Sequence, residues 1–321
     1  MSSLFITILN MSLTGAFVIG LICLVRLALK KIPKMISYCL WAAAGFRLIF
    51  PFSIESAFSL IPFNPELIPP DISVQPAAYA GVVGSNPFQV WVTIGLFLWL
   101  FGVTAMFFYG VASYMILKDK LKTATCVEAN ICELETIKTP FVFGIFSPKI
   151  YLPTDLTTWE RRYIVLHEQT HIRRCDNIVK YVAYLILCLH WFNPLVWLAF
   201  FLMGRDMEMS CDECVLKELS DNTKKEYSMA LLSLATEQRI LGEIPLAFGD
   251  GYIDGRIRNI LHLKRRSPVV LGVWMVLVVL FGMSLSVNRV SVGVVSPVPA
   301  QYEVGEGTND FITPWQCCDE T

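Results

Sequence analysis

Residues 165–172 read Val-Leu-His-Glu-Gln-Thr-His-Ile, and the five residues from His167 to His171 form an HExxH pattern. Residues four apart lie on the same face of a helix, so His167 and His171 can direct their imidazoles to one point. This geometry is half of a zinc site, in which Glu168 can reach a water on the metal and act as the general base. Because so short a pattern also occurs by chance, the rest of the sequence has to show whether these residues form a zinc site.

The helix that carries this motif has a predictable start. Thr157 and Glu160 match the capping-box pattern, so we expect a helix from Thr157 to about Arg174. Arginines stand at both ends of this segment, which predicts exposed ends and a buried middle.

A third metal ligand is predicted about 40 residues downstream, in the sequence Asp-Met-Glu-Met-Ser-Cys-Asp-Glu of residues 206–213. A zinc peptidase needs three protein ligands and an open position for water, and Glu208 is the best candidate for the third ligand. Asp212 lies four residues further along the same expected helix, where it can orient a ligand histidine. A carboxylate-rich helix is ordinarily a solvated face, but the HExxH motif and the apolar flanks favour metal binding here.

The apolar run 178–203 is expected to form a broken hairpin. It contains His-Trp-Phe-Asn-Pro at 190–194, and the proline should split the run into two pieces of about 10–12 residues, each too short to cross a bilayer. A crossing here would also place the ten Lys and Arg of residues 204–268 outside, against the positive-inside rule. His190 is a candidate oxyanion donor; the alternative is that its ring only satisfies a nearby backbone group.

Upstream of the motif, residues 139–153 read Thr-Pro-Phe-Val-Phe-Gly-Ile-Phe-Ser-Pro-Lys-Ile-Tyr-Leu-Pro. Aromatic and β-branched residues bounded by Gly and Pro predict two short strands around a turn. Two roles remain open for this element. It either receives a substrate as an added strand, with Phe141, Val142, Phe143 and Gly144 as the binding residues, or it is a structural hairpin.

The composition predicts an integral membrane protein. The chain has 321 residues, of which 55% are hydrophobic and 17% charged, with a mean hydropathy of +0.54. Apolar runs long enough to cross a bilayer occur at about 4–25, 35–54, 89–116 and 268–287. Arg47 lies inside the second run, where it either faces a protein partner or snorkels to the interface. No segment interleaves basic and aromatic residues, so no direct nucleic-acid contact is expected.

The distribution of charge predicts the topology. Arg26 and three lysines follow the first run at once, whereas residues 52–87 contain no Lys or Arg, which places that loop outside the cell membrane. We therefore expect a multi-pass protein with both termini exterior and four crossings. Its parts are a three-span region (1–117), a cytoplasmic-side catalytic domain (118–267), a last span (268–287) and a short exterior tail (288–321).

The ten cysteines are mostly interpreted as small core residues in a reducing compartment. Cys317 and Cys318 are the exception, because they stand in the expected exterior tail. They are able to pair with another chain there, although an ordinary frayed tail is the favoured interpretation. The oligomeric state is left open.

Four motifs in order resemble one family. The HEQTH motif, the 190–197 segment His-Trp-Phe-Asn-Pro-Leu-Val-Trp, the 208–212 segment Glu-Met-Ser-Cys-Asp and the 139–153 segment together resemble the BlaR/MecR-type antirepressor membrane zinc metallopeptidases. The similarity covers about residues 1–287. It implies one zinc ion per chain, held by His167, His171 and Glu208, with Glu168 as the base and Asp212 in support. The Glu-x-x-x-Asp arrangement is also similar, more distantly, to CaaX-type and HtpX-type membrane proteases.

The resemblance implies a mainly α membrane protein with a gluzincin-like metalloprotease domain and a small β element. The implied activity is cleavage of a protein or peptide in signal transduction, with a transcriptional repressor or the chain itself as the substrate. Residues 288–321 contain no lysine, so the penicillin-binding sensor of the best-known members, with its SxxK motif, is not expected here. Two alternatives remain open: a housekeeping membrane protease, or a catalytically silent membrane receptor or scaffold.

Overall fold

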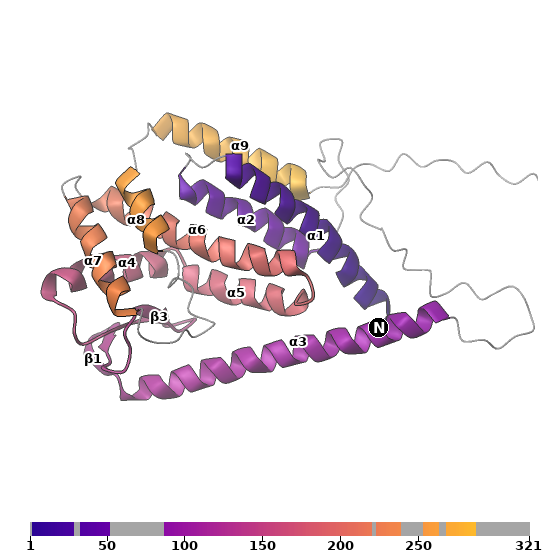
Figure 1. The fold of residues 1–321 in the computed structure, drawn as a ribbon, viewed down its shortest axis with the longest axis horizontal. Helices are drawn as coiled ribbons and strands as arrows, with labels where there is room; N and C mark the ends of the chain where they lie inside the picture. The colour runs from indigo at the N-terminus through magenta and orange to yellow at the C-terminus, as the bar shows by residue number, and fades with distance from the viewer. Residues whose placement is uncertain are drawn as a thin grey trace, which may run out of the picture. The chain divides into compact units, whose positions relative to one another are not determined.

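The computed structural model describes residues 2–28, 33–51, 87–219, 223–238, 253–262 and 268–286, and these residues are mainly α-helical (Figure 1). The helices are α1 (Ser2–Ala28), α2 (Lys34–Ile49), α3 (Pro87–Lys120), the 3-10 turn η2 (Leu121–Thr123), α4 (Thr158–Arg173), α5 (Asp176–Leu189), α6 (Pro194–Glu218), α7 (Lys224–Gln238), α8 (Ile253–His262) and α9 (Pro268–Ser286). The strands are β1 (Thr125–Glu128), β2 (Ile131–Glu133), β3 (Phe141–Phe143) and β4 (Lys149–Leu152). The mainly α fold class with a small β element is confirmed.

Two of the described helices, α1 and α3, are long and apolar enough to cross a bilayer. Large side chains on α3 are exposed, among them Trp91 at 71% and Phe101 at 73%, as expected of a surface that faces lipid. The other two predicted spans are also helical, α2 with 16 residues and α9 with 19. The total of four crossings stays a prediction, and the expected exterior loop and tail, with Cys317 and Cys318, lie outside the described residues.

Helix α2 packs against α1, α6 and α9. The core between these helices is apolar, with Ile36, Leu40 and Leu48 of α2 each at most 4% exposed. Arg47 is buried as well, at 4% exposed in the last turn of α2. Of its two predicted roles, the structure favours contact with protein over snorkelling to the interface.

The predicted break in the apolar run is present. Helix α5 ends at Leu189, and α6 begins at Pro194 after the N-cap Asn193, whose side chain accepts a hydrogen bond from the Leu195 N–H at 2.9 Å. The two helices pack together as a hairpin (Figure 1). The second piece is longer than predicted, because α6 continues for 25 residues to Glu218. The second part of the apolar run and the predicted third ligand are therefore parts of one helix.

The small sheet has the strand order β1-β2-β4-β3. The predicted antiparallel pair is β3 with β4, joined by a turn that requires Gly144, because its φ is 112° and a Cβ there would lie 2.7 Å from the Ser147 carbonyl oxygen. Strands β1 and β2 were not predicted. They pair antiparallel with each other, and β2 also pairs in parallel with β4, which is distant in sequence.

The interpretation of the cysteines fits only part of the described chain. Cys188 and Cys211 are buried, as expected of small core residues, but Cys175 is exposed. The structure also joins Cys126 and Cys132 in a disulfide, so the expectation of reduced cysteines is wrong for this pair. The reason is that β1 and β2 form a hairpin in which these two residues are directly opposite each other.

Candidate metal centre

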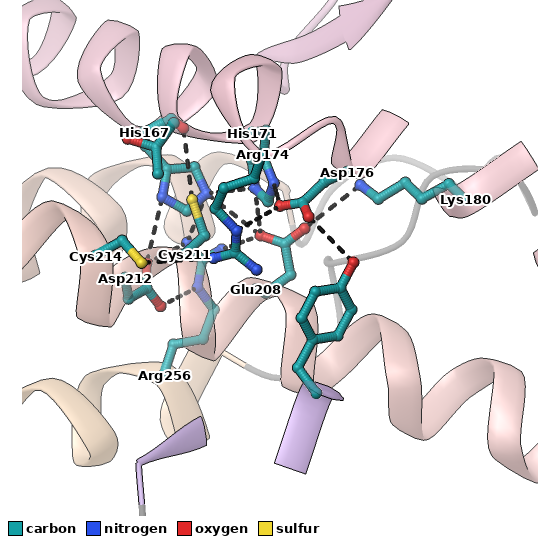
Figure 2. A network of polar contacts seen from close by, with 12 residues as sticks. His167, His171, Arg174, Asp176, Lys180, Glu208, Cys211, Asp212, Cys214 and Arg256 are labelled. Atoms are coloured by element: carbon teal, nitrogen blue, oxygen red, sulfur yellow. Dashed lines mark hydrogen bonds and ion pairs between the residues drawn. The ribbon is translucent and has the colours of Figure 1, made fainter. Parts of the chain in front are cut away.

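Helix α4 begins where its sequence predicts, with the complete capping box between Thr157 and Glu160. Ten residues later its buried face carries His167 and His171, each 5% exposed. Their Nε2 atoms lie 3.1 Å apart. Figure 2 shows the two rings beside one another above α6. The predicted convergence of the two imidazoles is therefore present.

Helix α6 places Glu208 under this histidine pair. Its Oε2 atom lies 3.3 Å from Nε2 of His167 and 3.5 Å from Nε2 of His171. Two ligand atoms that each lie about 2.0–2.1 Å from a tetrahedral zinc ion are separated by about 3.3 Å. The three donor atoms thus have spacings that fit one zinc ion or a similar divalent cation.

His171 has a carboxylate partner that was not predicted from the sequence. Asp176 accepts a hydrogen bond from Nδ1 of His171 at 2.8 Å, which leaves Nε2 of that ring able to bind a metal ion. Asp176 is 1% exposed and starts α5 directly after Cys175, whose φ of 56° turns the chain back toward α4. This partner could have been predicted from the sequence, because an acidic residue stands five positions after the motif.

Asp212 lies near His167, and Tyr227 lies between them. The Tyr227 hydroxyl on α7 lies 2.9 Å from Nδ1 of His167 and donates to Oδ1 of Asp212 at 2.6 Å. The Asp212 oxygen itself is 3.4 Å from the same ring nitrogen. The Nδ1 atom of His171 is therefore held by a carboxylate, and that of His167 by a tyrosine that is hydrogen-bonded to a carboxylate.

Two cations from outside the motif compensate the carboxylates. Arg256 of α8 makes a bidentate contact with Asp212, at 2.9 Å from Nε and 2.8 Å from one NH2 group, and its NH1 group lies 3.5 Å from Oε2 of Glu208. Lys180 Nζ lies 3.5 Å from the other oxygen of Glu208. Burial alone would raise the pKa of Glu208, but His171 and Lys180 hold it well below its ordinary value. Neither cation had a signal in the sequence.

Cys211 also lies in this cluster, although it was not predicted as a site residue. One nitrogen of each histidine and the Cys211 Sγ all lie within 4.8 Å of one another. Burial would raise the pKa of this thiol, but the two imidazoles lower it. Burial likewise disfavours the charged ring of His167, yet Cys211 and Glu208 raise the pKa of His167 to about 9. A divalent cation binding here would replace these protons, so binding should release protons.

The remaining predicted residues are placed as follows. Glu168 is buried on α4 beside His167. His190 lies at the other end of α5 from Asp176, where its Nε2 is 3.0 Å from the Leu48 carbonyl oxygen, which is the alternative weighed for it. Phe141, Val142 and Phe143 form β3 at an edge of the sheet, and the carbonyl of Gly144 accepts a hydrogen bond from Asn177 at 2.8 Å.

The chain is similar in sequence to known proteins. The family model described as BlaR1 peptidase M56 matches residues 6–260. The regulatory protein BlaR1 of Bacillus licheniformis is 32% identical over 141 residues, which are 42% of this chain and 24% of that protein. The methicillin resistance mecR1 proteins of Staphylococcus aureus and Staphylococcus epidermidis are each 27% identical over 160 residues, which are 43% of this chain and 27% of those proteins.

The matched part of the chain spans about a quarter of the length of these relatives. The family match is much more extensive, since it runs from the first apolar helix to α8 and includes both helices that form the candidate metal centre. The chain therefore belongs to the BlaR1 peptidase M56 family of membrane-associated metallopeptidases.

Proposed function

We propose that the chain is a membrane zinc endopeptidase that cleaves peptide bonds at the cytoplasmic face of the membrane. The observation that carries this proposal is the convergence of the His167 and His171 Nε2 atoms on Oε2 of Glu208, with pairwise separations of 3.1, 3.3 and 3.5 Å. His167, His171 and Glu208 would hold one zinc ion per chain. When bound, zinc lowers the pKa of its water toward about 7 and polarises the carbonyl of the peptide bond.

Glu168 is the proposed general base. It is buried beside the first ligand, where its carboxylate takes a proton from the attacking water and passes it to the leaving amine. Arg256 is better placed than His190 to stabilise the charge that develops on the carbonyl oxygen, because its NH2 group is 3.3 Å from Nε2 of His167. The bidentate contact with Asp212 fixes this guanidinium before any substrate binds.

The edge strand β3 is the proposed substrate platform. An extended peptide can add to a free sheet edge through backbone hydrogen bonds, with little demand on its side chains. The Asn177 side chain ties the end of β3 to the start of α5, one residue after Asp176. A peptide on Phe141–Gly144 would therefore run past the metal centre.

A cytoplasmic location is supported by where the basic helix ends lie. Arg26, in the last turn of α1, forms an ion pair with Asp206 at 2.7 Å, two residues before Glu208. The N–H of Lys34, at the start of α2, donates to Glu213 at 2.9 and 3.0 Å. Positively charged ends of membrane helices face the cytoplasm, and these ends meet α6 next to the metal centre.

The biological role proposed for this activity is signal transduction. Similarity to a protein named regulatory protein BlaR1 and to proteins named methicillin resistance mecR1 supports a regulatory substrate. A transcriptional repressor or the chain itself is the substrate class that we propose.

The test uses detergent-purified protein, its zinc content and cleavage of fluorescently labelled casein. The wild type should contain about one zinc per chain and cleave, Glu168→Gln should keep the zinc and lose about 10²–10⁴-fold in cleavage rate, and His171→Ala should lose both. Cleavage by Glu168→Gln at the wild-type rate would overturn the peptidase assignment. Absence of zinc from the wild type would favour the silent receptor or scaffold instead.

A further inference from the structure

The helix α6 presents three potential donors to the histidine pair, and only two of them have a role so far. Cys211 and Asp212 come three and four residues after Glu208, so all three lie on one face of the helix. Glu208 is the proposed ligand and Asp212 orients His167. Cys211 stands between them and has no part in the proposed mechanism.

The Cys211 sulfur lies close to both histidines. It is 0% exposed, and together with one nitrogen of each histidine it forms a set of donor atoms that lie within 4.8 Å of one another. A sulfur at about 2.3 Å and a nitrogen at about 2.0–2.1 Å from one tetrahedral zinc ion are about 3.6 Å apart, so a shift of about 1 Å at most brings the sulfur to a ligand distance from the two nitrogens. Figure 2 shows the sulfur between α6 and α4, beside the two imidazole rings.

We propose that Cys211 is a fourth ligand of the metal in most molecules of the resting protein, which closes the centre and lowers, without abolishing, the rate of peptide cleavage. This inference rests on the proposed function, because it concerns the same zinc ion. Two nitrogens, one carboxylate oxygen and one thiolate make a complete tetrahedral set, and complete sets are typical of structural zinc sites. A catalytic centre needs an open position for water, so the thiolate has to leave before a peptide bond can be cleaved.

The competing explanation is that Cys211 is only a small core residue. Its sulfur contacts the backbone carbonyl oxygen of His167 at 3.5 Å, and it packs in an apolar cluster with Tyr163, Val215 and Tyr227. An alanine or valine would serve that packing as well as a thiol. The two explanations differ in one measurable property, the presence of sulfur in the zinc shell.

Zinc K-edge X-ray absorption of the detergent-purified full chain measures that property directly. We expect one sulfur scatterer at about 2.3 Å besides nitrogen and oxygen at about 2.0–2.1 Å. A shell of nitrogen and oxygen alone around a stoichiometric zinc ion would overturn the proposal and leave the proposed peptidase intact. Failure to find zinc would instead refute the proposed function.

Two variants test the consequence for activity. Cys211→Ala should lose the sulfur scatterer, bind zinc at least about 10-fold more weakly and cleave labelled casein faster per bound zinc than the wild type. Cys214→Ala is the matched control, because this half-buried cysteine on the same helix contacts Arg174 at 3.9 Å and should change neither the spectrum nor the rate. A wild-type sulfur shell combined with an unchanged or lower rate per zinc in Cys211→Ala would refute the inhibitory effect of this ligand. If Cys211→Ala does not fold, the wild-type spectrum still decides whether Cys211 is a ligand.

Discussion

At the scale of single residues, the centre depends on partners that hold each ring in one orientation. Asp176 does this for His171 and also accepts a hydrogen bond from the Tyr38 hydroxyl of α2 at 3.1 Å. The carboxylate fixes which ring nitrogen carries the proton and makes the metal-facing nitrogen more basic. Asp176 acts through His171 and does not touch the reacting atoms, so it is a positioning residue.

Replacing this carboxylate should weaken metal binding. We expect Asp176→Asn to lower zinc affinity by about 10–100-fold, because the amide is a poorer acceptor and permits the wrong ring tautomer. A competition titration with a chromophoric chelator measures this change. Asp155→Asn, at an exposed position before α4, is the control and should bind zinc like the wild type. Equal affinity in Asp176→Asn would show that the backbone of α4 alone orients His171.

At the scale of secondary-structure elements, the start of α4 sets the direction in which the motif points. The pKa of Glu160 is lowered, because hydrogen bonds from Ser233 and Thr157 to its carboxylate outweigh burial, which by itself would raise the pKa. A carboxyl group with a lower pKa in the folded state stabilises the fold above its ordinary pKa, and this stabilisation is lost as the pH falls through the folded value.

The expected result for Glu160→Gln is therefore a pH-dependent loss of stability. The variant should lower the free energy of unfolding by about 1 kcal/mol at pH 7, and this difference should shrink toward zero below about pH 4. Urea unfolding of the detergent-solubilised protein at both pH values measures the effect. Glu135→Gln, at an exposed position, should change the free energy by less than about 0.5 kcal/mol at either pH. A pH-independent loss in Glu160→Gln would contradict the assigned role of its charge.

At the scale of the whole molecule, α6 connects the membrane helices with the metal centre. Asp206 is 0% exposed and accepts two hydrogen bonds from Arg26 of α1 at 2.7 Å and one from the Trp41 indole of α2 at 2.9 Å. Two and six residues further along, α6 supplies Glu208 and Asp212. A displacement of α1 or α2 would therefore act on the helix that carries the proposed ligand Glu208.

Breaking this buried pair should be costly, and replacing both partners much less so. We expect Asp206→Ala to lower the free energy of unfolding by about 3–5 kcal/mol, because it leaves the Arg26 charge without its buried carboxylate. The double variant Arg26→Leu with Asp206→Leu should recover most of this loss. Thermal unfolding in detergent compares the two variants. A double variant less stable than Asp206→Ala would show that the pair does more than neutralise two buried charges.

The sequence by itself determined what local geometry controls. The four-residue spacing of His167 and His171, the capping box at Thr157 and the break before Pro194 each follow from the geometry of one helix, and all three are present in the structure. The choice of Glu208 rested on the need for a third ligand and on the acidic segment about 40 residues downstream, and the family resemblance implied the same residue. The strands around Gly144 were predictable because only a few residue types suit such a turn.

Only the tertiary structure decided what surrounds these residues. Arg256 and Tyr227 come from α8 and α7, and β2 pairs with β4 across a long loop, so no spacing in the sequence could indicate them. Cys211 was interpreted, with most of the cysteines, as a small core residue. Its position beside the histidines depends on how α4 and α6 pack. Local periodicity fixes which face of a helix a residue occupies, whereas packing between distant segments fixes what that face meets.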